Sequence, residues 1–147
     1  MTTLNLRPPK LNIRFNKGTS ISHAFFYVDK DYLPINISTY SAYMQARLSY
    51  TSLLPTLDLD TLTKGGLSIV QATTTLDDYL IIPGEKVIFT GKVIPNCYGI
   101  KLDLTSTQTA LLTPEIPLLY DIELVSTTPL TFPFLMGTLL PYNEVTK

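Results

Sequence analysis

The run from Ala42 to Tyr50 constrains the fold most, because its side chains alternate between two kinds. Every second position is small, apolar or aromatic, and these positions hold Ala42, Met44, Ala46, Leu48 and Tyr50. The positions between them are mostly polar and hold Tyr43, Gln45, Arg47 and Ser49. Successive side chains of a β-strand point to opposite faces of its sheet. The run therefore predicts a strand with one face on a core and the other in water.

Other parts of the chain repeat this alternation. The apolar side chains that we expect to point inward are Leu11, Ile13 and Phe15, then Ile100, Leu102 and Leu104, and finally Leu118, Tyr120, Ile122 and Leu124. Residues typical of turns separate the runs, at 16–18, 29–31, 64–66 and 83–84. Some eight or more short strands with turns at regular spacing, and almost no helix, predict an all-β protein, an antiparallel β-sandwich.

Three further segments complete the expected layout. Residues 1–10 show no core periodicity, and prolines at positions 8 and 9 favour an extended N-terminal arm. Residues 11–147 are expected to form a single β-sandwich domain. Turn residues at 83–84 and at position 91 predict a β-hairpin within about residues 70–97. Ser106 or Thr107 is expected to cap one helical turn that ends before Pro114.

The composition indicates a surface that other chains cover. Only 16% of the 147 residues are charged, whereas a soluble domain usually has about 25%. A chain this poor in charge exposes more apolar surface than a lone monomer usually does. We therefore expect partner chains to cover much of the surface. The alternative is a sandwich with a large core and outer faces rich in threonine and serine.

Charge and cysteine content exclude other classes. The net charge is −1 and the cations form no cluster, which argues against nucleic-acid binding. The stretch from Leu124 to Asn143 carries no formal charge, but Pro129, Pro133 and Pro141 interrupt it. We expect two strands and a turn there, not a membrane span. The single cysteine, Cys97, allows no internal disulfide and suits a reducing compartment.

The residues that could carry chemistry predict no catalytic, metal or cofactor site. His23 is the only histidine and lies in a strand-like run. Cys97 follows Pro95-Asn96, so we expect an inert or buried thiol in a loop. No loop has the spacing of an EF-hand, and Gly65-Gly66 lacks the Lys-Ser/Thr of a phosphate loop. The remaining acidic pairs, read as loop acids in water, are Asp58 with Asp60 and Asp77 with Asp78.

Tyrosine content leaves a choice between sugar stacking and protein packing. The chain has nine tyrosines and no tryptophan. Several tyrosines fall at positions expected to face inward. Core or interface packing is therefore favoured over sugar binding, since tyrosine is also enriched at protein interfaces.

Several motifs, in one order along the chain, carry a resemblance to a known family. They are Lys17-Gly18-Thr19, the run from Leu33 to Arg47 after an acidic turn, Gly65-Gly66-Leu67-Ser68-Ile69, Ser106 to Leu111, Tyr120 to Leu124, and Gly137 to Thr146. This order resembles small tail and baseplate structural proteins of tailed bacteriophages, similar to baseplate upper protein N-terminal domains. Those proteins carry glycine where this chain has Tyr32 or Leu33, and glycine again where it has Thr39. Shorter members lack the stretch from Val70 to Cys97, so the hairpin is an insertion, expected at the rim.

The resemblance implies an Ig-like β-sandwich and a non-enzymatic structural role. We expect a subunit of a phage virion, in the tail, baseplate or neck, assembled in the host cytoplasm. Its partners would be other virion structural proteins, and it would be multimeric in the particle, with no nucleic acid and no membrane. The alternatives are a capsid decoration protein and a carbohydrate-binding receptor module of the tail.

Overall fold

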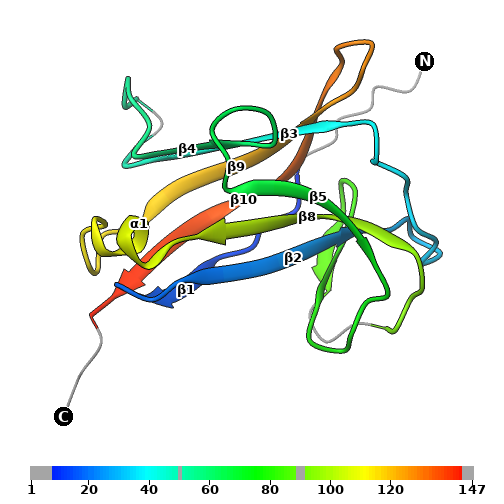
Figure 1. Ribbon diagram of the computed structural model, residues 1–147, viewed down its shortest axis with the longest axis horizontal. Coiled ribbons are helices and arrows are strands. Elements are labelled where there is room, and N and C mark those ends of the chain that lie inside the picture. Colours follow the sequence, from blue (N-terminus) through cyan, green and yellow to red (C-terminus); the bar gives the residue numbers. More distant parts are fainter. Residues whose placement is uncertain (1–7, 50, 89–91, 144–147) are drawn as a thin grey trace.

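The computed structural model describes residues 8–49, 51–88 and 92–143, which form two five-stranded sheets (Figure 1). Sheet A contains, in spatial order, β1 (Ile13–Asn16), β10 (Thr131–Tyr142), β9 (Leu118–Val125), β3 (Ser41–Arg47) and β4 (Leu57–Asp60). Sheet B contains β5 (Leu67–Ala72), β8 (Cys97–Leu104), β2 (Ile21–Tyr27), β6 (Tyr79–Ile82) and β7 (Lys86–Ile88). The all-β prediction is confirmed.

Both sheets are mixed, so the prediction of wholly antiparallel pairing was wrong at two places. β1 runs parallel to β10, and β2 runs parallel to β6. The other pairings between named strands are antiparallel. Parallel neighbours need a long crossover connection. β1 and β10 lie near opposite ends of the sequence, and some 50 residues separate β2 from β6, so local turn signals could not reveal either pair.

The two sheets share one apolar core, to which almost every strand contributes. Alternation decides which residues enter it. Ala42, Met44 and Ala46 are fully buried, as expected for one face of β3. The inward residues predicted for β8 and β9 are buried as well. Leu48 was predicted wrongly, because β3 ends one residue earlier and the Leu48 side chain is 60% exposed; Tyr50 lies outside the described residues.

The predicted hairpin is present as β6 and β7, with a turn at Pro83-Gly84. It does not simply project from the rim. β6 pairs with β2 along Phe25–Tyr27, and its Leu80 and Ile81 are fully buried. A second small cluster covers the outer side of this hairpin and of β2, and it includes Phe26, Val28, Ile94 and Cys97. The hairpin therefore completes sheet B.

Cys97 and the helical turn refine two local predictions. Cys97 is not in a loop but begins β8, where it is fully buried. The helix α1 (Ser106–Ala110) is present, but Thr105 is its N-cap instead of Ser106 or Thr107. The Thr105 hydroxyl accepts from the Gln108 backbone N–H, and the Gln108 side chain accepts from Thr105 N–H, which forms a capping box.

The uncharged stretch near the end of the chain forms two strands and a turn, as predicted. β9 ends at Val125, and β10 begins at Thr131 and shifts register between Pro133 and Leu135. The shift lies beside Pro133, and a bulge is one of the few places where a strand tolerates proline. In the part of the chain that the structure describes, no helix is long and apolar enough to cross a membrane.

The segment before β1 lies against β10. The Met136 N–H donates to the Pro9 carbonyl, and the Leu11 N–H donates to the Met136 carbonyl. The Leu11 carbonyl also accepts the Tyr120 hydroxyl at 2.6 Å, which joins this segment to β9. Gly137 makes the approach possible, because a Cβ there would lie 1.9 Å from the Leu11 carbonyl oxygen. Residues 1–7 of the expected arm lie outside the described residues.

Candidate binding groove

The outer face of sheet A carries a groove that follows from strand alternation. β9 lies between β10 and β3 in the sheet. Its outward side chains therefore form the middle of this face, and those of β10 and β3 form the two sides. The groove has a volume of about 240 Å³. Its lining residues are Pro8, Gln45, Arg47, Ser49, Leu119, Tyr120, Asp121, Ile122, Glu123, Pro133, Leu135 and Met136.

A second hollow of about 260 Å³ continues the groove toward β4. It shares Gln45, Asp121 and Glu123 with the first hollow. Its other lining residues are Tyr43, Asp58 and Lys64. We call the two hollows together the outer groove. It is apolar toward β10 and polar toward β4.

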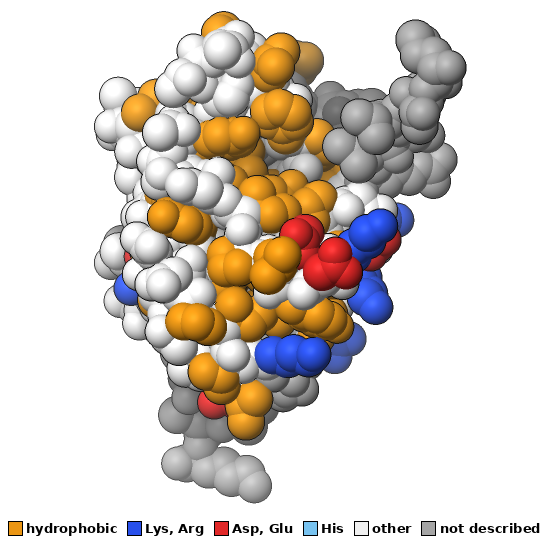
Figure 2. Space-filling view, turned by 90° about the vertical axis from the view of Figure 1, so that its right-hand side faces the viewer, with side chains coloured by type: hydrophobic (Ala, Val, Ile, Leu, Met, Phe, Trp, Pro, Cys, Tyr) orange, Lys and Arg blue, Asp and Glu red, His pale blue; other side chains and the backbone are white. Residues whose placement is uncertain are grey.

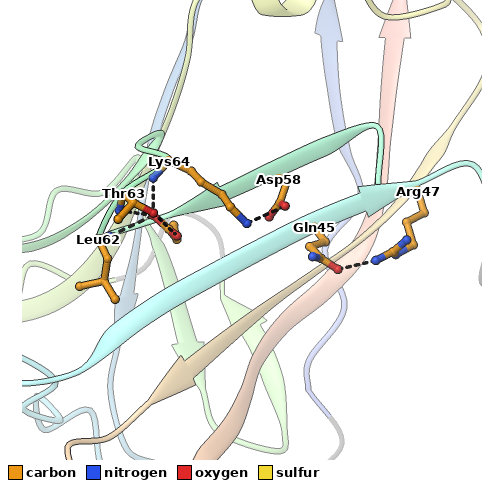
Figure 3. A network of polar contacts seen from close by, with 7 residues as sticks. Gln45, Arg47, Asp58, Leu62, Thr63 and Lys64 are labelled. Atoms are coloured by element: carbon orange, nitrogen blue, oxygen red, sulfur yellow. Dashed lines mark hydrogen bonds and ion pairs between the residues drawn. The ribbon is translucent and has the colours of Figure 1, made fainter. Parts of the chain in front are cut away.

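Hydrogen bonds hold the polar side of the outer groove (Figure 3). The Arg47 guanidinium donates to the Gln45 side-chain carbonyl oxygen at 2.6 Å and to the Ser52 backbone carbonyl at 2.9 Å. Lys64 Nζ lies 2.6 Å from Asp58 Oδ2, and this hydrogen bond is the main reason that the pKa of Lys64 is raised. Both cations are thus already engaged within this face.

Asp60 organises the turn that brings Lys64 to the groove. One of its carboxylate oxygens accepts the backbone N–H groups of Leu62, Thr63 and Lys64. These bonds, that from Lys64 first, lower the pKa of Asp60. Asp60 is thereby a structural residue of the turn, not a loop acid in water as predicted, and its side chain is buried.

The two acids of β9 both have raised pKa values. Partial burial raises the pKa of Asp121, and the Arg47 charge opposes that effect. Burial and then the neighbouring Asp121 charge raise the pKa of Glu123. Within the described residues, the Glu123 side chain makes no hydrogen bond or ion pair. A cation arriving at this position would therefore relieve the repulsion between the two carboxylates.

The chemistry of the outer groove is suited to binding an extended chain. Leu119, Pro133 and Met136 offer apolar contacts, and Asp121 and Glu123 offer acceptors for a cation. Apolar surface bordered by a few placed polar groups is the usual character of a binding site.

The reactive residues singled out in the sequence lie elsewhere. His23 is on β2 of sheet B, is exposed, and meets the Tyr79 ring edge-on at 6.3 Å. Cys97 is buried at the start of β8, and burial raises the pKa of its thiol. Neither residue lines the outer groove. The structure does not bring the two into one pocket.

The remaining acids and tyrosines take part in turn hydrogen bonds and in packing. Asp78 accepts the Thr75 backbone N–H at 2.7 Å, and the described residues hold no group of three or more His, Cys, Asp or Glu that could bind a metal. Tyr27 and Tyr120 are buried, as inward packing predicted, and burial raises the pKa of Tyr27 to about 12. Tyr43 faces outward and lines the second hollow.

The surface also carries exposed apolar side chains. Figure 2 shows the end of the molecule where the loop between β2 and β3 lies, and hydrophobic side chains, interspersed with others, run down the middle of that face. Across the described residues the exposed large apolar side chains are Leu33, Leu48, Leu53, Leu54, Leu62, Leu76, Val93, Leu111, Ile116 and Leu130. That their exposure exceeds that of an ordinary monomer, and that partner chains cover them, both stay predictions.

Sequence reasoning placed the groove residues on outward positions but did not assemble them. Gln45, Arg47, Asp121 and Glu123 all alternate with buried residues. Their convergence depends on β9 lying between β3 and β10, which a single sequence does not reveal. The signal that could have found them is the pair of acids at Asp121 and Glu123, two residues apart on one strand face.

No protein-family model, curated protein or solved structure matches the chain.

Proposed function

We propose that the fold is an Ig-like β-sandwich with an inserted hairpin. In variable-type Ig domains, strands B, E and D share one sheet, and strands C, F and G share the other with C′. The orders β2-β8-β5 and β10-β9-β3-β4 fit this assignment strand by strand. The β6–β7 hairpin lies between the D-like strand β5 and the E-like strand β8, and it occupies the sheet edge beside the B-like strand β2.

In this proposal the chain is a non-enzymatic structural subunit of a phage virion, in the tail, baseplate or neck. It assembles in the host cytoplasm with other virion structural proteins. The observation that carries this role is the outer groove, which places apolar and acidic groups on a rigid sheet face. The collinear sequence motifs support the virion setting, and the exposed apolar side chains support extensive contacts with partners.

The direct test is the position of the chain in intact particles. Electron microscopy of virions that contain the protein should find it in the tail, baseplate or neck, with the outer groove against a neighbouring chain. Density on the capsid lattice would instead favour a capsid decoration protein. Absence of the chain from purified particles by mass spectrometry would contradict a virion role.

A carbohydrate-binding receptor module is the second candidate, and one aromatic pair favours it. The Tyr40 and Phe132 rings stack with centroids 6.1 Å apart at 27°, and both are only half-buried. Aromatic faces can stack on sugar rings. A glycan array that shows binding, lost in Tyr40→Ala, would establish this candidate, whereas a blank array would remove it.

A further inference from the structure

The outer groove holds an acid without an ion-pair partner among the described residues. Glu123 lies on β9 in the groove lining, and its side chain makes no hydrogen bond or ion pair there. The two nearby cations are engaged, since Lys64 pairs with Asp58, and Arg47 donates to one side-chain and one backbone oxygen. A segment with one cation beside apolar side chains would therefore complement this face.

Strand register places the first described residue beside this acid. Lys10 pairs in parallel with Met136 on β10. Because the pairing is parallel, the residues before Lys10 lie toward the start of β10, where Pro133 is paired with Glu123. Pro8, the first described residue, follows that direction and already lines the outer groove. The chain at Pro8 is therefore at the groove of its own molecule.

Residues 1–7 have the composition that complements this groove. They read Met-Thr-Thr-Leu-Asn-Leu-Arg, and Arg7 carries their only charged side chain. Leu4 and Leu6 are apolar, like the side of the groove that β10 forms. The segment thus combines one cation with apolar side chains, as the groove requires.

Arg7 has to span only a short distance to meet the acid. It adjoins Pro8 in sequence, and only β10 separates the chain at Pro8 from β9, so the two backbones lie about 10 Å apart. An arginine can lay its apolar stem over Pro133 and Met136, which line the groove, and hold its guanidinium at Glu123. No second molecule is needed to bring a cation to Glu123.

We propose that residues 1–7 bind in the outer groove of their own molecule, with Arg7 at Glu123. A segment joined to its groove acts at an effective concentration in the millimolar range, which favours it over the same segment of another copy. A neighbouring chain then has to displace the segment to bind the groove. Only this last consequence rests on the proposed structural role. The contact itself is measured on the isolated chain, so either proposal can fail alone.

The carboxyl pKa of Glu123, followed by nuclear magnetic resonance on the isolated full-length chain, tests the contact. Arg7→Gln removes the cation, so the pKa of Glu123 should rise by about 0.5, the size expected for a partly exposed ion pair. Lys10→Gln is the matched control, because Lys10 is exposed and does not line the groove. The proposal is overturned if Arg7→Gln leaves the pKa of Glu123 unchanged, or if both substitutions raise it equally.

Dilution separates a contact within one molecule from a contact between copies. Within one molecule, the effect of Arg7→Gln on the pKa of Glu123 is the same in dilute and concentrated samples. An effect that fades on dilution would assign the segment to the groove of a second copy and overturn the proposal.

A synthetic peptide of residues 1–7 gives a second measurement. Arg7→Glu changes no residue of either sheet, and it places like charges together, so it should release the segment from the groove. The peptide should then bind the Arg7→Glu chain about tenfold more tightly than the unchanged chain, whose own segment competes with it. Amide shift changes at Asp121 and Met136 report the binding. Equal binding to both chains, or binding to neither, would contradict the proposal.

Discussion

The two faces of sheet A differ in what their residues do, although the same strands supply both. On the inner face of β9, Tyr120, Ile122 and Leu124 are buried in the core. On its outer face, Asp121 and Glu123 are exposed and line the outer groove. Neighbouring residues along one strand therefore belong to the core and to the outer groove in turn. The difference teaches that the outer face of this sheet can vary without disturbing its core.

The largest expected effect is a difference in the free energy of unfolding between substitutions at two neighbouring residues of β9. Ile122→Ala removes buried methyl groups and leaves a cavity, so it should lower the free energy of unfolding by about 2–5 kcal/mol. Glu123→Ala, one residue further on, should change it by no more than about 0.5 kcal/mol. Urea denaturation of both variants measures the contrast. Equal losses of stability would show that the inner and outer residues of β9 do not differ in their contribution to folding.

The next effect concerns the hydroxyl that ties the inner face to the segment before β1. Tyr120→Phe keeps the buried ring but removes the donor to the Leu11 carbonyl. We expect a loss of about 1–2 kcal/mol, because the carbonyl then lacks this hydrogen bond in a largely buried site. Thermal denaturation measures the loss. Tyr142→Phe is the matched control, and its half-buried ring should change stability less.

The smallest effect lies on the outer face and depends on pH. The folded state raises the pKa of Asp121 and of Glu123, so it holds their protons more tightly than the unfolded state does. Their contribution therefore favours folding at low pH and is lost as pH rises through the raised folded-state values. Both groups are partly exposed, which keeps the change below about 0.5 kcal/mol.

Difference measurements isolate this pH effect from that of Asp60, whose lowered pKa acts in the opposite direction. The double variant Asp121→Asn/Glu123→Gln should gain stability relative to the unchanged chain as pH rises from about 3 to 7. Urea midpoints at several pH values give the difference curve. A flat curve would mean that folding does not raise the pKa of the two carboxylates.

How much of the structure the sequence predicts depends on how far apart in the sequence the interacting residues lie. Alternation is local, so it located β3, β8 and β9 and the inward residues of each. β4 was not predicted, because Pro55 and the acids at positions 58 and 60 suggested a loop. In the structure Asp58 pairs with Lys64 while Asp60 caps the following turn. Both acids are thereby compatible with a short strand.

The backbone geometry of one turn is a second feature that the sequence alone does not predict. Tyr32 adopts φ of 62°, which glycine would adopt without steric cost. Asp29 supports this conformation, since its carboxylate accepts the backbone N–H groups of Asp31 and Leu33. Lys92 Nζ also lies 4.4 Å from the centre of the Tyr32 ring. The contact with Lys92 joins residues 60 positions apart, so the sequence alone could not reveal it.

The most direct test of the account maps which face of the chain a neighbouring protein covers. Hydrogen–deuterium exchange, followed by mass spectrometry, compares the isolated chain with the chain assembled in particles. The account predicts slower amide exchange around Gln45, Asp121, Glu123 and Met136, with no change on the outer face of sheet B. Slower exchange confined to sheet B, or no change at all, would contradict the claim that the outer groove is the binding face.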